Sequence, residues 1–295
     1  MKNQLSKLLL LILLGDILTS ASFAQSLDPS RLIHRVISSN ITNQDYRLFI
    51  VLPEDYSASS EESYDVVYAL DIDTAASTQL VQFQRAFAQL PTIPAFILVG
   101  VGFSPDEEHR GLRTAHFSPS NNEEIDEEIL ALFPTLSTSA NVENWRSGKA
   151  QEFAEVLGSE IIPTIEADFS TSGRDTAMGA SLAGLFLTEV LIEQPELFEN
   201  YVITSPSVWW NDFEIFQNNS SLNRDDLSGR VYLSVGGLEN SEMLDSYNRL
   251  SDVLAENDSA NLLFKAELIA DQTHQSVIPI SFMNGLNHIY SDPVD

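Results

Sequence analysis

The chain has 295 residues, 43% of them hydrophobic, and its 43 acidic and 15 basic residues give a formal net charge of −28. This length and apolar content predict a folded protein with a sizeable core and exclude a disordered polymer. The charge disfavours binding to nucleic acid or anionic lipid, and the absence of cysteine excludes disulfides and thiolate chemistry.

Residues 1–24 have the three parts of a secretory signal peptide: a start with two lysines, an apolar run at 8–14 and a small-residue cleavage site at 22–24. The apolar run is too short to span a bilayer, so stable membrane insertion is not expected. A buried first helix is the alternative. We expect a secreted or periplasmic protein with a mature chain of residues 25–295, whose oligomeric state the sequence leaves open.

The rest of the chain alternates between strand and helix patterns. Two apolar stretches, 31–38 and 46–53, flank a polar turn and predict an antiparallel hairpin. Further strands are expected at 64–73, 94–103, 175–179, 200–205, 230–237 and 262–270, and helices at 79–90, 148–169, 181–194, 241–257 and 276–290. This alternation predicts a single α/β domain with a mostly parallel sheet, the hairpin at its start and helices on both faces.

The segment 104–147 interrupts this alternation. It is acidic and polar and shows little periodicity. A loop of this length in a compact domain usually has a function or is mobile, and an insertion without a role is the alternative. Whether the segment covers a site is left open.

One serine stands where a nucleophile is expected. Ser181 lies between Gly179 and Gly184, at the junction of an expected strand and an expected helix, which is the context of a nucleophile elbow. The N–H of Leu182, at the start of that helix, would face developing negative charge. The strict pattern has glycine where this chain has Ala183. The alternative is that the serine is only a small residue that lets the helix pack closely.

A serine nucleophile needs a base, and in folds of this type the acid and then the histidine follow the serine along the chain. Of the five histidines, only His274 and His288 follow Ser181. His274 lies in a loop between the last strand and the last helix, and His288 lies inside that helix. We therefore predict His274 as the base.

The acid is expected in the loop after the strand at 230–237. Glu239 comes first and would accept the Nδ1 proton of His274, while Glu242 and Asp245 follow closely. In so acidic a chain a carboxylate is easily found in any loop. A charge at the start of a helix is therefore the alternative explanation for Glu239.

Two tryptophans follow the carboxyl end of the strand at 200–205, on the edge that carries the elbow. Trp209 and Trp210 would form an aromatic wall for an acyl or aryl group. Packing in the core is the alternative for one of them.

These residues together resemble the putative esterase family of α/β-hydrolases, which includes siderophore esterases and feruloyl esterases, from about Ile37 to Tyr290. The segments that carry the resemblance are RLFIVLPEDY, DVVYALD, ILVGVGF, GASLAGLF, ELFENYVITSPSVWWND, VYLSVGGLEN and THQSVIP. SPSVWWND is typical of the siderophore-esterase-like branch. The resemblance implies Ser181 as nucleophile, His274 as base and Glu239 as acid.

The chain departs from the family's pattern near the expected site. Ile72 replaces the glycine of LDG in a turn that, by resemblance, supplies a second N–H to the oxyanion hole, and Ala180 replaces the histidine before the nucleophile. Arg113 resembles the arginine of Arg-x-x-Asp-Tyr-Thr-Pro, with His116 and Phe117 in place of Asp and Tyr. It would meet an anionic substrate group or, as the alternative, an acid of the protein.

We therefore expect an exported serine hydrolase that cleaves carboxylic esters of small molecules through an acyl-enzyme, without a metal or organic cofactor. An acyltransferase on the same scaffold is one alternative. A ligand-binding protein whose activity has decayed is another, because of the changes at Ala180 and Ile72.

Overall fold

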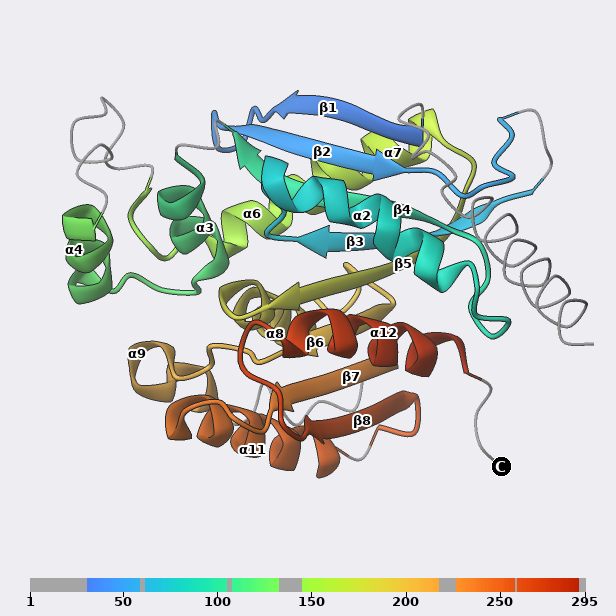
Figure 1. Ribbon diagram of the computed structural model, residues 1–295. Helices are drawn as coiled ribbons and strands as arrows, with labels where there is room; N and C mark the ends of the chain where they lie inside the picture. Colours follow the sequence, from blue (N-terminus) through green and yellow to red (C-terminus); the bar gives the residue numbers. More distant parts are fainter. Residues whose placement is uncertain are drawn as a thin grey trace, which may run out of the picture. The chain divides into compact units, whose positions relative to one another are not determined.

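An eight-stranded sheet forms the centre of the protein (Figure 1). The computed structural model describes residues 31–58, 62–104, 108–132, 145–217, 227–257 and 259–291. The strands are β1 (Leu32–Ser38), β2 (Asp45–Val51), β3 (Tyr64–Leu70), β4 (Phe96–Ser104), β5 (Thr171–Ala180), β6 (Asn200–Thr204), β7 (Gly229–Gly236) and β8 (Leu262–Ile269). Their order is β1-β2-β4-β3-β5-β6-β7-β8. The strand β2 pairs antiparallel with β1 and β4, and all other neighbours are parallel, which confirms the predicted sheet.

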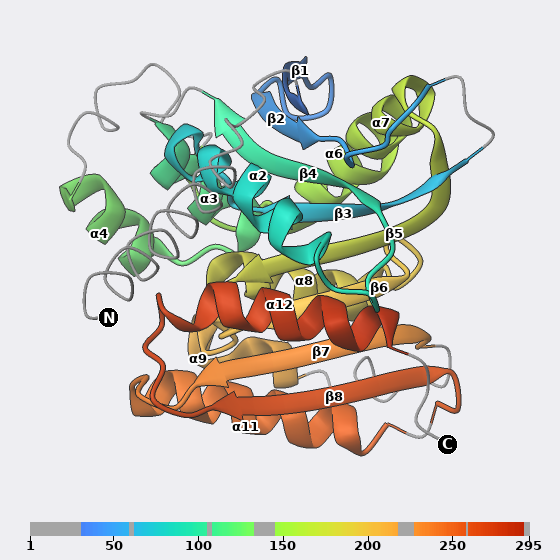
Figure 2. The same cartoon turned by 45° about the vertical axis from the view of Figure 1, so that its right-hand side comes forward.

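Helices cover both faces of the sheet, as predicted (Figures 1 and 2). One face carries α2 (Thr74–Phe87) and α12 (Val277–Tyr290), and the other carries α6 (Ala150–Val156), α7 (Ile162–Asp168), α8 (Leu182–Glu193) and α11 (Ser241–Ala255). The buried side chains form two clusters, one beneath each layer of helices. The inner strands are therefore apolar on both sides; in β4, every residue except Ser104 is buried.

Several elements differ from their predicted bounds, and for α2 the reason is local. The helix α2 begins five residues before the expected 79, because the carboxylate of Asp73 accepts a hydrogen bond from Ala76 N–H and caps the helix. The expected helix 148–169 contains a π-helical turn, Leu157–Ile161, between α6 and α7. The strand β5 is longer than the expected 175–179.

The segment 104–147 is not the long irregular loop that its composition suggests. The described part contains the helices α3 (His109–Phe117) and α4 (Glu123–Leu132). Most of α3 is buried, and it packs against α8 and α6. Its buried face contains two histidines, a threonine and a glycine, so the segment has few apolar residues although it is amphipathic, and sequence reasoning missed it. Residues 105–107 and 133–144 lie outside the described part.

By its internal contacts, the chain divides into Met1–Arg31 and Leu32–Asp295. The expected signal peptide lies outside the described residues, so it stays a prediction. Across the described ranges, none of the helices combines the length and the hydropathy that a membrane span requires.

Candidate active site

Ser181 occupies a sharp turn between β5 and α8. Its backbone has φ 60° and ψ −121°, in the left-handed half of conformational space that serine rarely adopts. Its N–H donates to Thr204 O at 3.0 Å, and its own carbonyl accepts from Leu185 N at 2.9 Å and Ser207 N at 3.1 Å. The turn thus has the strained geometry of a nucleophile elbow, held by hydrogen bonds on both sides.

Small neighbours make this turn possible. A methyl group added at Gly179 would lie 3.0 Å from the backbone of Ala183, and one added at Gly184 would lie 3.1 Å from Thr204 O and from Pro206 Cα. The glycines therefore let α8 approach β5 and β6 closely, as the elbow pattern requires.

Glu239 and His274 form a hydrogen-bonded pair. Oε2 of Glu239 lies 2.6 Å from Nδ1 of His274, and Oε1 accepts from the Ser205 hydroxyl at 2.6 Å and from Gly236 N–H at 2.9 Å. Only 1% of the Glu239 side chain is exposed, against 33% of the His274 side chain. The pairing directs Nδ1 to the carboxylate and leaves Nε2 for the role of base that the sequence predicts.

The hydrogen bonds decide the charge of Glu239. Burial raises the pKa of its carboxyl, but the donors from His274, Ser205 and Gly236 more than offset this, so the pKa lies below its ordinary value. Glu239 is therefore an ionised carboxylate near neutral pH, in the form that orients and supports a histidine.

The topology brings the predicted residues to one edge of the sheet. Ser181 follows β5, Glu239 follows β7 and His274 follows β8, and these strands are parallel, so their carboxyl ends meet on the same side (Figure 1). His288 lies in α12, where its Nε2 is 3.2 Å from Leu263 O. His274 is therefore the histidine that pairs with Glu239, as predicted, and His288 contacts a backbone carbonyl of β8 instead.

The two predicted oxyanion donors differ in the structure. The first hydrogen bond of α8 runs from Leu185 N to Ser181 O. The N–H of Leu182 lies before it, in the first turn, where backbone N–H groups have no acceptor within the helix. The N–H of Ile72 instead donates to Val101 O at 3.0 Å and continues the pairing of β3 with β4. The prediction of Ile72 as an oxyanion donor is therefore wrong, because this N–H is already bound.

Arg113 is held by an acid of the protein. Its Nε lies 2.9 Å from both oxygens of Asp71 and its Nη2 lies 2.6 Å from Oδ2, while Nε2 of His109 lies 2.9 Å from Oδ1. Burial raises the pKa of Asp71, and Arg113 and His109 outweigh it, so the pKa is well below its usual range. Of the two alternatives for Arg113, the structure thus shows the protein acid.

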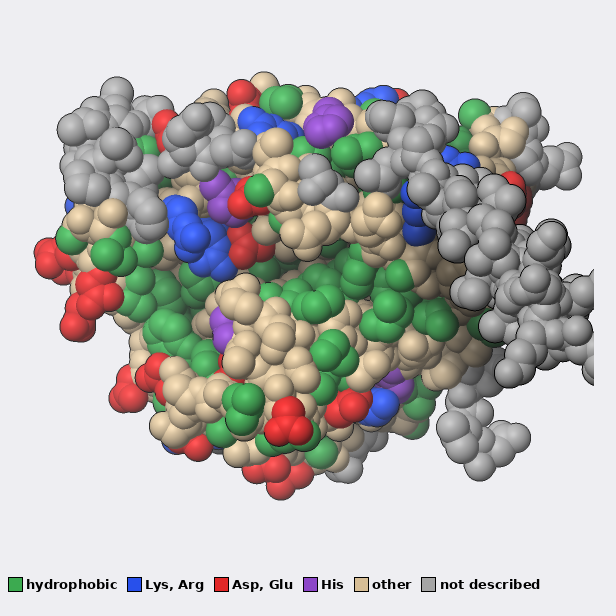
Figure 3. Space-filling model, in the orientation of Figure 1, with side chains coloured by type: hydrophobic (Ala, Val, Ile, Leu, Met, Phe, Trp, Pro, Cys, Tyr) green, Lys and Arg blue, Asp and Glu red, His purple; other side chains and the backbone are tan. Residues whose placement is uncertain are grey.

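This charged group lies near the elbow. The register Ala69↔Met178 between β3 and β5 leads Asp71, two residues onward, toward the residues just before Ser181. In Figure 3 a hollow lined with hydrophobic side chains crosses the face between α2 and α12, and basic, acidic and histidine side chains gather at its end near α3. The end of this hollow near α3 therefore lies on the side of the carboxyl ends of the parallel strands, beside the charged side chains.

The two tryptophans have different surroundings. Trp210, in the short helix α9 (Trp210–Phe213), is 1% exposed, and its Nε1 donates to Ser120 O at 3.1 Å. Trp209 is only partly buried, with its Nε1 3.3 Å from Met243 Sδ. Trp210 is thus a core residue, which corrects the prediction that both rings face substrate. Trp209 remains a candidate.

Sequence reasoning missed two serines at this edge. Ser205 binds Glu239, and Ser207 Oγ lies 3.4 Å from Ser181 Oγ. Both stand in the Ser-Pro-Ser segment after β6 and are almost fully buried. The burial and contacts of these hydroxyls depend on neighbouring strands, so the sequence alone carries no signal for them.

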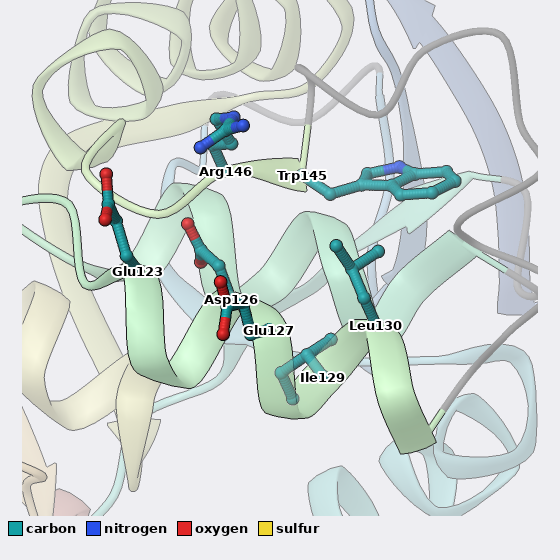
Figure 4. A pocket seen from close by; sticks show the side chains of 7 residues that line it. All are labelled: Glu123, Asp126, Glu127, Ile129, Leu130, Trp145 and Arg146. Carbon is teal, nitrogen blue, oxygen red and sulfur yellow. The ribbon is translucent and has the colours of Figure 1, made fainter.

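Within the described ranges, the His, Asp and Glu side chains form no group of three or more that could hold a metal ion. A separate hollow of about 220 Å³ lies beside α4 (Figure 4), and its lining contains none of the three predicted catalytic residues. The lining residues are Glu123, Asp126, Glu127, Ile129, Leu130, Trp145 and Arg146.

A parallel sheet with a serine elbow after one strand, and an acid and a histidine after later strands, defines an α/β-hydrolase. Comparison with known proteins agrees with this class. The chain belongs to the family described as "Putative esterase", whose model matches residues 39–277, and it is a carboxylic ester hydrolase.

Individual relatives support the predicted resemblance. The chain is 27% identical over 259 residues to the ferri-bacillibactin esterase BesA of Bacillus subtilis. The aligned region covers 83% of this chain and 85% of BesA. It is 23% identical over 176 residues to a siderophore enterobactin esterase of Emericella nidulans. The aligned region covers 58% of this chain and 56% of that relative. The crystal structure of the BES protein from Bacillus cereus superposes with a TM-score of 0.73 at 26% identity, covering 91% and 99% of the two chains.

Proposed function

We propose that the protein hydrolyses its ester through a covalent acyl-enzyme on Ser181. The observation that carries this proposal is the 2.6 Å contact between Glu239 and His274, at the same sheet edge as a serine in a strained turn. A serine hydroxyl is a weak nucleophile at neutral pH and needs a base. The ionised Glu239 supports the positive charge that His274 acquires when it takes the proton.

The steps follow from these roles. Ser181 Oγ attacks the ester carbonyl while Nε2 of His274 removes its proton, and the N–H of Leu182 stabilises the oxyanion. His274 then returns the proton to the departing alcohol, which leaves an acyl ester on Ser181. Water, activated by His274 in the same way, attacks this ester and releases the acid.

The substrate that we propose is an ester of a small molecule. The relatives named for ferri-bacillibactin and enterobactin make siderophore esters the first natural substrates to test. The hollow in Figure 3 supports a substrate with apolar groups. Trp209 is proposed as one wall of the binding region.

Export is part of the proposal, and it is supported by the sequence of residues 1–24. Expression of the full chain in a bacterial host, followed by fractionation and amino-terminal sequencing, tests it. A periplasmic or secreted form that starts at Gln25 is expected. A form that keeps its first 24 residues would contradict it.

The mechanism is tested with p-nitrophenyl esters from acetate to octanoate. Turnover should fall to the background rate in Ser181→Ala and in His274→Ala, while both variants keep the wild-type circular dichroism spectrum. A fluorophosphonate should add to one residue, Ser181, as seen by peptide mass spectrometry. Ester turnover that survives in folded Ser181→Ala would refute the serine mechanism.

A further inference from the structure

Ser205 directly follows β6, the strand next to the elbow strand, and contacts Glu239 of the Glu239–His274 pair. Its N–H donates to Ser234 O at 2.7 Å, and its hydroxyl donates to Oε1 of Glu239 at 2.6 Å. The residue has no exposed surface. Together with Gly236 N–H and His274, its hydroxyl is one of three donors around the carboxylate.

The backbone of Ser205 is unfavourable for a residue with a side chain. Its φ is 43°, in the left-handed region that favours glycine. The preceding residue, Thr204, accepts the N–H of Ser181, so this strained stretch also supports the elbow. A glycine would fit the backbone more easily, but it would leave Oε1 of Glu239 without the hydroxyl donor.

We propose that Ser205 is a positioning residue of the ester hydrolase, whose hydroxyl holds Glu239 ionised and in the orientation that aligns His274. This inference rests on the proposed serine mechanism. Within the described residues, His274 is the titratable group that contacts the Glu239 carboxylate, and the other two donors are neutral. Loss of a neutral donor makes the ionised form of the Glu239 carboxylate less stable, and it leaves the number of charged groups at the site unchanged.

Two substitutions at this residue separate the hydroxyl from the backbone. Ser205→Ala removes the hydroxyl and keeps the strained backbone, and Ser205→Gly removes the hydroxyl and relieves the strain. Both should lower kcat about ten-fold or more, with KM within about two-fold of wild type, since hydrogen bonds to charged groups are the stronger ones. The acid limb of the pH–kcat profile should move up by about one unit, because it reports protonation of the coupled Glu239–His274 pair, whose carboxylate then has one donor fewer.

Ser234→Ala is the matched control. It removes another fully buried hydroxyl, which lies 2.5 Å from Ser281 Oγ and does not contact Glu239, so kcat and the pH profile should stay as in wild type. A Ser205→Gly enzyme with wild-type kcat and pH profile would overturn the inference, whatever Ser205→Ala shows. Thermal midpoints of all three variants establish that they are folded.

A double substitution keeps the test independent of stability. In Glu239→Gln, adding Ser205→Ala should change kcat less than two-fold, because the hydroxyl then has no carboxylate to hold. A full ten-fold further loss would show that Ser205 acts elsewhere. Turnover that persists in Ser181→Ala would instead refute the proposed function itself, which keeps the two failures distinct.

Discussion

Nδ1 of His274 lies 2.6 Å from Oε2 of Glu239, and this carboxylate is buried while the imidazole is one-third exposed. The pair therefore has one end fixed in the protein and the other open toward the carboxyl edge of the sheet. A buried carboxylate keeps its charge only where donors surround it, and three donors do so here. The arrangement suits an acid that orients a base.

Glu239→Gln should lower kcat on the order of 10³-fold at pH 7 to 8, because an amide does not support a positive imidazole as a carboxylate does. Burst kinetics with p-nitrophenyl acetate would measure acylation directly. Glu242→Gln is the control, since Glu242 is exposed at the start of α11 and was the second candidate acid. If the two substitutions had equal effects, the assignment of Glu239 would be wrong.

Arg113→Ala should lower the free energy of unfolding by roughly 3 kcal/mol at pH 7, because it takes the guanidinium away from Asp71 and leaves the contact with Nε2 of His109. The lowered pKa of Asp71 means that the pair contributes fully above the ordinary value of 3.8 and loses its contribution as the pH falls below it. Urea unfolding at pH 7 and pH 3 should therefore show a smaller difference between variant and wild type at the lower pH.

Arg35→Ala serves as the control for that experiment. It breaks the ion pair between Arg35 and Asp168, whose side chains are 38% and 32% exposed, respectively. Such surface ion pairs contribute at most about 1 kcal/mol to stability. An equal loss in both variants would show that Arg113 contributes no more than a surface charge.

Gly102→Ala should destabilise the protein by roughly 2–3 kcal/mol. The added methyl group would overlap the carbonyl oxygen of Ile72, and this backbone has little room to move because Ile72 N–H is bound to Val101 O. In Gly158→Ala the methyl group would meet only the end of the Leu197 side chain, at 3.0 Å. That control should stay within about 1 kcal/mol of wild type by thermal unfolding.

The sequence predicted most of the sheet because its strands are apolar runs bounded by polar turns, and it predicted the Glu239–His274 pairing because chain order limits the partners of Ser181. It did not predict what depends on strand neighbours. The N–H of Ile72 is used by Val101 across β3 and β4, and Ser205 reaches Glu239 across β6 and β7. Neither contact leaves a pattern along a single chain.

The remaining prediction concerns Asp175, a carboxyl group in β5 that is 8% exposed and whose Oδ1 has no hydrogen-bond partner in the described structure. Burial, with Glu166, Asp65 and Glu199 nearby, raises its pKa from 3.8 to about 7. Between about pH 4 and pH 7, Asp175 is ionised in the unfolded chain but still protonated in the folded protein. The free energy of unfolding therefore falls as the pH rises through this range. Asp175→Asn should stabilise the protein by about 1 kcal/mol or more at pH 8 and by less at pH 5, measured by urea unfolding. Asp252→Asn, at an exposed acid of α11, should show no such pH-dependent gain, and a gain for Asp175→Asn that is equal at both pH values would contradict the explanation.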